Sequence, residues 1–177
     1  MYCGKNKTAL ASQQQISDAL LELMRAKPFS AISVSELCKR SRVSRQTFYS
    51  LFRSKENVVL FTLQEKYCCQ PAAPAGPPTL GQLCAGYSDY IFDNRAFLKL
   101  LVDNDIIYLL YDSIYSSFMD CHCPMAVTGP AERGYAAHFL AGGLTGIVKN
   151  FCLEDCRLSR SDLRGLLNHL FSGSVFV

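Results

Sequence analysis

The stretch 33–60, SVSELCKRSRVSRQTFYSLFRSKENVVL, constrains the fold more than any other part of the chain. It predicts two short helices joined by a tight turn and followed by the start of a third helix. Ser33, with Glu36 three residues later, forms a capping-box pattern, so a helix is expected to begin at Val34. Val34 and Leu37 then recur at helical spacing, which predicts one buried face.

The second helix of this pair, RQTFYSLF, has an apolar side and a polar side. Ser44 is its expected N-cap. The apolar side is expected to consist of Phe48, Leu51 and Phe52, which leaves an outer side of Arg45, Gln46, Thr47 and Tyr49. Arg and Gln side chains match the purine edges of a DNA major groove, and hydroxyl groups suit phosphates. The outer side therefore predicts a helix that reads DNA.

The third helix is expected to open at Ser54, where Lys55 adds a cation to the free N–H groups of the helix N-terminus and could bind a phosphate. A helix pair in the core of an unrelated protein is the alternative, because such pairs are common. The combined caps, turn, inward apolar residues and outward polar residues favour DNA binding. We expect base contacts from Arg45 and Gln46. We expect phosphate contacts from Ser33, Thr47, Tyr49 and Lys55, and Ser44 completes the DNA-binding set.

The segment from about Thr8 to Lys66 resembles the N-terminal domain of the TetR/AcrR family of bacterial regulators. The family pattern VS-x-x-T-[FY]-Y-x-[HY]-F-x-[SN]-K-[ED] is matched at Val43, Ser44, Thr47, Phe48, Tyr49, Phe52, Ser54, Lys55 and Glu56. Leu51 replaces the usual His or Tyr, and Arg42 replaces a turn Gly that often requires a left-handed backbone. The resemblance covers about a third of the chain. It implies a DNA-binding head on a helical body that binds a ligand and dimerises.

The charge distribution agrees with a head and a body. Residues 1–66 hold 11 Lys and Arg against 5 Asp and Glu, whereas residues 67–177 hold 7 against 10. A basic first third on an acidic remainder is what a DNA-binding head would show, although chance asymmetry of a solvated surface is the alternative. The hydrophobic content of 49% with 19% charged residues indicates a folded chain.

Other classes of protein have less support. The first residues lack an apolar signal region, and the longest apolar uncharged run, 134–148, is only 15 residues long, so we expect a cytoplasmic protein that does not bind membranes. The nine cysteines are odd in number and irregularly spaced, which argues against a disulfide framework. Only 121–123, Cys-His-Cys, resembles metal ligands, and no second pair follows, so we expect no metal and no cofactor. Three scattered histidines give little support to an enzyme.

An all-α fold is expected. The predicted divisions are a helix-turn-helix head over 1–66 with a linking helix at about 54–69, a Pro-rich link over 70–79, and a helical ligand-binding and dimerisation body over 80–177. Apolar periodicity predicts the other helices at about 8–25, 80–93, 95–101, 106–120, 132–154 and 162–171. Asn104 or Asp103 is expected to cap the helix over 106–120.

The body offers candidates for a ligand pocket. Three tyrosines recur at spacings of three and four residues, which ordinary core packing also explains. Because the body of the family usually encloses a ligand cavity, tyrosine rings with their hydroxyls also suit a pocket for an unidentified small-molecule effector. The expected pocket residues are Tyr87, Tyr108, Tyr111, Tyr115 and His138.

The last two helices are candidates for a dimer interface. Glycines inside a helix cost roughly 1 kcal/mol each relative to Ala, so the three in 139–151, FLAGGLTGIVKNF, predict a close approach to another helix. The resemblance implies a four-helix bundle between two subunits, with Phe139, Gly142, Gly146, Leu163 and Leu167 at the interface; completion of the monomer core is the alternative. The same stretch also resembles a family subset related to the dihydroxyacetone-kinase regulator, which commonly has Trp where Phe151 stands.

We therefore expect a ligand-responsive repressor that binds a palindromic operator as a homodimer, with its two recognition helices in successive major grooves about 34 Å apart. Double-stranded DNA, a second copy of the chain and a small molecule are the expected partners. The alternative is a co-regulator of the same fold that acts through a protein partner and binds DNA weakly or not at all.

Overall fold

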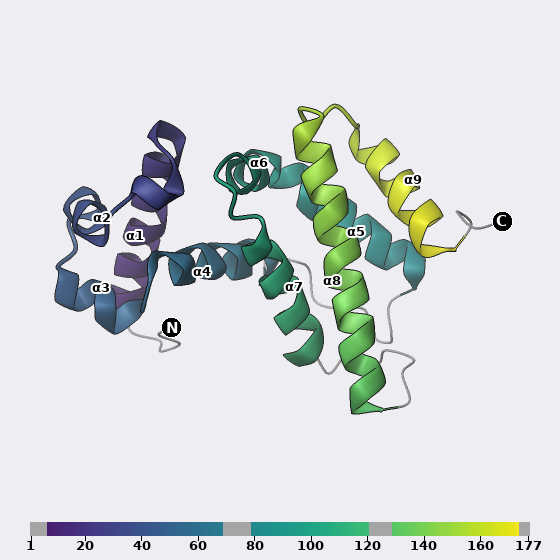
Figure 1. Cartoon of the computed structure of the whole chain (residues 1–177), viewed down its shortest axis with the longest axis horizontal. Coiled ribbons are helices and arrows are strands. Elements are labelled where there is room, and N and C mark those ends of the chain that lie inside the picture. Colours follow the sequence, from purple (N-terminus) through teal and green to yellow (C-terminus); the bar gives the residue numbers. More distant parts are fainter. Residues whose placement is uncertain (1–6, 69–78, 121–128, 174–177) are drawn as a thin grey trace.

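The computed structural model describes residues 7–68, 79–120 and 129–173, and every regular element within these ranges is helical (Figure 1). The all-α prediction is confirmed. The elements are α1 Lys7–Ala26, the 3-10 turn η1 Phe29–Ala31, α2 Val34–Ser41, α3 Arg45–Leu51, α4 Lys55–Cys68, α5 Leu80–Asp93, α6 Arg95–Asp103, α7 Tyr108–Asp120, α8 Pro130–Leu153 and α9 Arg160–Phe171.

Helices α1 to α3 form a head at one end, and α4 leads from it toward the body of α5 to α9 (Figure 1). The head core combines one apolar stripe from each helix, and its fully buried members include Ile16, Leu20, Leu37, Phe48 and Val58. A buried hydrogen bond of 2.6 Å between the hydroxyls of Ser17 and Thr62 joins α1 to α4. The N-terminal part of α4 therefore belongs to the core of the head.

The body is built on α8, which packs along α7 and against α6, while α5 packs against α9. In Figure 1 α7 descends beside α8 as α8 ascends, so the two helices are antiparallel. A small apolar cluster of Cys84, Leu144 and Leu167 joins α5, α8 and α9. The head and the body share one continuous set of buried apolar residues that runs from α1 to α9.

Two expectations about the body helices are wrong. Asn104 does not cap α7; it is the C-cap of α6, and its Nδ2 donates to the Leu100 carbonyl at 2.9 Å. Because α6 extends to Asp103, α7 begins only at Tyr108. On α5, Leu80 and Leu83 belong to the apolar periodicity of the helix, but each is 43% exposed, whereas Ser88 and Tyr90 are buried. Periodicity places apolar residues on one face without showing how much of the helix is covered.

Two sequence features lie outside the described residues. They are the cluster 121–123 and most of the Pro-rich stretch 70–79, of which only Thr79 is described, as the N-cap of α5 in a capping box with Gln82. The division of the chain at 70–79 stays a prediction. Within the described ranges, no helix combines the length and the apolar character that crossing a lipid bilayer requires.

Candidate DNA-binding surface

Helix α3, the expected recognition helix, is buried on one side and exposed on the other. Phe48, Leu51 and Phe52 are buried, as expected. The Ser44 hydroxyl caps the helix by accepting from the backbone N–H of Thr47 at 3.0 Å. A helix of this length is unstable alone, so these anchors maintain its shape.

The opposite side of α3 presents exposed polar residues. Arg45 and Gln46 are exposed in the first turn, and Tyr49, one turn further, is 48% exposed. Thr47 is half-buried, and its hydroxyl lies 2.8 Å from that of Ser44. The structure thus brings the four predicted outer residues together around the N-terminal half of α3.

The turn before α3 has the left-handed backbone that the sequence comparison pointed to. Arg42 has φ 57°, and the N–H of Val43 donates to the Cys38 carbonyl at 3.1 Å. A non-glycine residue in this conformation costs roughly 1 kcal/mol. Next to Arg42, the buried Ser41 hydroxyl donates to the Leu37 carbonyl at 2.8 Å and so stabilises the last turn of α2.

The N-terminus of α2 is capped, but not by a complete capping box. The exposed Ser33 hydroxyl accepts from the Glu36 N–H at 3.2 Å, as expected. The Glu36 carboxylate pairs with Lys27 instead of reaching back to the N-cap backbone. The hydrogen bond from Lys27 lowers the pKa of Glu36. This pair links the end of α1 to the start of α2.

Lys55 has a structural role that the sequence did not reveal. Its ammonium group donates to the carbonyls of Phe29 and Ile32, the latter at 3.0 Å, and lies 4.3 Å from the centroid of the Phe29 ring. An ammonium group has three N–H donors, so one stays free for a phosphate. The predicted phosphate contact of Lys55 is not tested by this geometry and stays a prediction.

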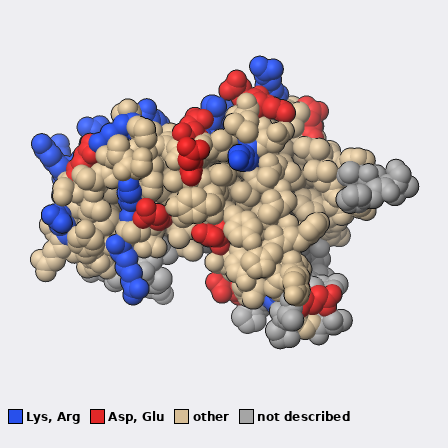
Figure 2. Space-filling view, in the orientation of Figure 1, with Lys and Arg blue, Asp and Glu red and all other residues tan. Residues whose placement is uncertain are grey.

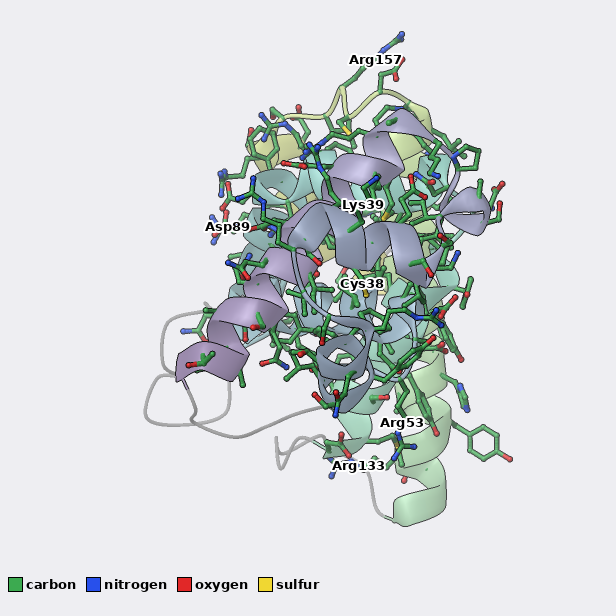
Figure 3. The ribbon with its side chains drawn as sticks, turned by 90° about the vertical axis from the view of Figure 1, so that its left-hand side faces the viewer. Cys38, Lys39, Arg53, Asp89, Arg133 and Arg157 are labelled. Carbon is green, nitrogen blue, oxygen red and sulfur yellow. The ribbon has the colours of Figure 1, made fainter. Side chains whose placement is uncertain are left out.

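Two exposed cations near α3 were missed by the sequence interpretation. Arg42 precedes the helix and Arg53 follows it, and neither has an acidic partner among the described residues. Figure 3 looks onto the head end and shows Arg53 near its lower edge, with Lys39 higher on the same end. In Figure 2 the blue side chains gather over the head. Arg42 lies just before the family pattern and Arg53 stands at a position that the pattern leaves open, which explains why the motif alone did not point to them.

The expected ligand residues are only partly gathered. Tyr111, Tyr115 and His138 form one stack between α7 and α8, with the Tyr115 and His138 ring centroids 4.3 Å apart. The Tyr111 hydroxyl hydrogen-bonds to His138 Nδ1. Tyr87 instead packs against the cluster of α5, α8 and α9, and Tyr108 is exposed. The stack is half-exposed, so the pocket assignment stays a prediction.

The expected dimer residues divide into an exposed set and a buried set. Phe139 is 73% exposed, and Gly142 and Gly146 face solvent, where an added methyl group would meet no atom within 4 Å. Leu163 and Leu167 are 0% exposed, so they complete the core of the subunit and cannot contact a second copy directly. Gly142 and Gly146 border a groove of about 410 Å³ between α8 and α9. Leu166 of α9 lines the same groove and is partly exposed.

Comparison with known proteins agrees with this architecture. The family described as "Bacterial regulatory proteins, tetR family" matches residues 16–60, which extend from the middle of α1 into α4. The HTH-type dhaKLM operon transcriptional activator DhaS of Lactococcus lactis is 28% identical over 109 residues. That alignment covers 62% of this chain, and the chain spans about half, 51%, of the length of this curated relative.

Two solved structures share the fold over nearly the whole chain. The protein Lin0861 from Listeria innocua aligns with a TM-score of 0.78 at 13% identity, covering 97% of this chain and 95% of its own. The dihydroxyacetone kinase operon activator DhaS aligns with a TM-score of 0.55 at 16% identity, covering 92% and 95%. The matched segment holds the capped helix pair, the left-handed turn and the exposed side of α3. Over residues 16–60 the chain is therefore similar to the bacterial regulatory proteins of the tetR family.

Proposed function

We propose that this chain is a cytoplasmic transcriptional regulator that binds a palindromic DNA operator as a homodimer. The observation that carries the proposal is the geometry of α3. One side of this helix is buried, Ser44 caps its N-terminus, and the other side exposes Arg45, Gln46 and Tyr49 within the segment that matches the tetR family. Such a helix suits a major groove, because its exposed groups hydrogen-bond base edges and phosphates while its apolar side holds it to the head.

Each exposed group has a role in this proposal. Arg45 and Gln46, in the first turn of α3, contact base edges, where bidentate side chains discriminate between bases. The hydroxyls of Ser44, Thr47 and Tyr49, together with that of Ser33, the N-cap of α2, contact phosphates. Lys55 offers its remaining N–H. Arg42 and Arg53, which have no acidic partner in the part of the chain that the structure describes, extend the phosphate contacts on either side.

The base contacts are tested with DNA that the wild-type protein selects from a random duplex library. An Arg45→Ala/Gln46→Ala variant is expected to lose roughly 2–6 kcal/mol of discrimination between the selected duplex and a scrambled one. The matched control, Arg157→Ala/Gln64→Ala, removes the same two side-chain types from exposed positions away from α3. Equal selectivity of the double variant and the wild type would contradict the base-contact assignment.

A second copy of the chain is proposed to pack against the exposed face of α8. Tyr135, Phe139, Gly142, Gly146, Lys149 and Leu153 are exposed and follow one another at spacings of 4, 3, 4, 3 and 4 residues. This spacing forms one narrow, mostly apolar stripe, and exposed apolar surface of this kind is typical of an interaction site.

The stripe is also symmetric along the helix. Tyr135 and Leu153, Phe139 and Lys149, and the two glycines lie at equal distances from the same midpoint. In an isologous antiparallel pair each residue therefore meets its symmetry mate: glycine against glycine, the Phe139 ring against the partner's Lys149, and the Tyr135 ring against the partner's Leu153. The glycines allow the two helices to approach closely at the crossing. This self-complementarity supports a homodimer through α8.

A small molecule in the body is proposed to change the spacing of the two heads. The stack of Tyr111, Tyr115 and His138 offers ring faces and polar atoms between α7 and α8. Two turns further along the same face of α8, the hydroxyl of Thr145 is buried without a hydrogen-bond partner among the described residues. Buried unpaired hydroxyls are costly, so a ligand that supplies the missing partner is favoured. Ligand-induced stabilisation against heat, absent in Thr145→Val, tests this site.

The direction of regulation has two candidates. Repression is the first proposal, because a dimer seated on an operator blocks access to it. Activation is the second, because the Lactococcus lactis relative is named a transcriptional activator. Transcription from a promoter placed beside the selected DNA, with and without the protein, distinguishes the two.

A co-regulator that acts through a protein partner is the alternative function. The exposed apolar face of α8 is the observation that favours it, since a different protein could occupy that face. A folded protein that stays monomeric and binds random and selected DNA equally would support this alternative over the homodimeric regulator.

A further inference from the structure

One side chain of the body makes hydrogen bonds to the backbone of the head. Asn104 closes the C-terminus of α6, and its Oδ1 accepts from the backbone N–H of Phe29 in η1 at 2.7 Å. Its Nδ2 donates to the Leu100 carbonyl at 2.9 Å and approaches the Met24 carbonyl of α1 at 3.4 Å. One amide group therefore joins the end of α6 to the end of α1 and to the turn that follows it.

The residue that Asn104 contacts is also the residue that Lys55 contacts. The side chain of Phe29 is buried, and its carbonyl accepts from the Lys55 ammonium, which also lies over its ring. Lys55 is the first residue of α4 and follows closely after Phe52, the C-cap of the recognition helix. Polar contacts therefore run without interruption from α6 through Asn104, Phe29 and Lys55 to the junction of α3 and α4.

The other side of α6 is tied to the end of α8. Lys99 pairs with Asp155 at 3.4 Å and donates to the Cys152 carbonyl at 3.5 Å. The hydrogen bond with Asp155 raises the pKa of Lys99, which agrees with this pairing. The C-terminal half of α6 thus contacts the head through Asn104 and the central helix of the body through Lys99. In Figure 1 α6 lies on the side of the body that faces the head.

We propose that Asn104 is the positioning residue that fixes the orientation of the DNA-binding head on the body. The bonds to Phe29 and Met24 oppose rotation of the head about α4, which is the helix that leads from the head into the body. The consequence for DNA rests on the proposed function: in a dimer, a fixed orientation sets the distance between the two recognition helices and thus the preferred spacing of operator half-sites. A change in α6 would reach the head through this amide.

Asn94 provides a matched control. It also closes a helix, α5, with φ −102° and ψ 13°, against −102° and 8° at Asn104. Its Nδ2 donates to the carbonyl four residues earlier, that of Tyr90, at 2.9 Å, as Asn104 does to Leu100. The side-chain and backbone N–H groups of Asn94 donate only to carbonyls of α5, so these hydrogen bonds do not involve the head. Asn94→Ala therefore removes the same local contact and keeps the contacts between the head and the body.

The first test measures amide hydrogen exchange at Phe29 and the rotational tumbling of head and body by NMR, without DNA. Asn104→Ala is expected to accelerate Phe29 exchange about tenfold and to give the head a shorter correlation time than the body. Asn94→Ala is expected to leave both unchanged. Asn104→Asp keeps an acceptor for the Phe29 N–H and should restore slow exchange. Wild-type exchange and common tumbling in Asn104→Ala would overturn the proposal.

The second test uses duplexes that carry the selected half-sites at several spacings. Wild type and Asn94→Ala are expected to prefer one spacing, and Asn104→Ala is expected to lose about tenfold of that preference. An unchanged preference would overturn the positioning role. Should the wild type bind no duplex, the proposed function fails, whereas the exchange and tumbling experiment still decides whether Asn104 holds the head. If Asn104→Ala does not fold, Asn104→Ser takes its place in both tests, because its shorter side chain does not reach the Phe29 N–H. It is then compared with Asn104→Asp, which keeps the acceptor.

Discussion

Replacing Gly142 and Gly146 by leucine should stabilise the isolated subunit and abolish the dimer. Both glycines lie inside α8 and face solvent, and an added methyl group meets no atom within 4 Å in the subunit. Glycine costs a helix roughly 0.5–1 kcal/mol relative to a good helix former, so Gly142→Leu/Gly146→Leu should raise the free energy of unfolding of the monomer by roughly 1–2 kcal/mol. A defect in association then cannot be explained by a damaged subunit.

The dimer should respond in the opposite direction. In the proposed antiparallel pair the two glycines of one subunit meet those of the other, so the double variant inserts four leucines at the crossing. Overpacking costs about 1–3 kcal/mol for each inserted side chain, and even partial relief leaves a loss of at least about 3 kcal/mol. The dissociation constant should therefore rise more than about a hundredfold.

Sedimentation over a range of protein concentrations measures the dissociation constant, and urea denaturation over the same range measures stability. Wild type is expected to show a denaturation midpoint that rises with concentration, and the double variant a midpoint that does not. Gly81→Leu is the control, because Gly81 is an exposed helical glycine of α5 with equally open surroundings. A double variant that dimerises as tightly as wild type would refute the reasoning, and so would one that is less stable as a monomer.

Three further predictions concern the head. Lys55→Met should lower the free energy of unfolding by roughly 2–4 kcal/mol, measured by urea denaturation, because two charge-assisted hydrogen bonds are lost; Arg53→Met, at an exposed position, should change it little. Arg42→Gly should raise the free energy of unfolding by about 0.5–1 kcal/mol, because glycine adopts the left-handed backbone without strain. Arg40→Gly, inside α2, should lower it by about 1 kcal/mol. Melting temperatures that shift in the same direction in both variants would contradict this. The hydrogen bond from Lys27 holds the pKa of Glu36 below its ordinary value of 4.5 in the folded state, so the contribution of this carboxylate to stability is present above pH 4.5 and is lost as the pH falls through the folded pKa. In Glu36→Gln the stability should therefore fall less steeply at acid pH, and an identical acid dependence would contradict this.

The head was predictable because its signals are local. Ser33 and Ser44 lie three residues from the N–H groups they cap, and the left-handed turn at Arg42 lies at the position where the family pattern usually has glycine. Sequence spacing alone therefore locates the helices α2 and α3 and the exposed side of α3. The role of Lys55 was not predictable, because its carbonyl acceptors lie 23 and 26 residues away and depend on how α1 and α4 pack.

The body was less predictable, because periodicity does not show which neighbour covers a face. Leu163 and Leu167 share a stripe with Leu166 and Leu170, but α5 and α8 bury the first two and leave Leu166 partly exposed. Asn104 suited an N-cap by its residue type and position, yet its amide closes the preceding helix and bonds to a backbone N–H 75 residues away. Contacts of this kind depend on tertiary packing, so the local sequence does not predict them.

The most direct test of the central claim is the affinity of the purified protein for its selected duplex across a salt series. If a dimer binds six to ten phosphates, log K should fall linearly with log salt with a slope of about −5 to −9, and the affinity should fall about 10³–10⁵-fold between 50 and 200 mM salt. The selected duplex should also bind at least about a thousandfold more tightly than random DNA. A folded protein with a slope near zero and equal affinity for both duplexes would contradict the account.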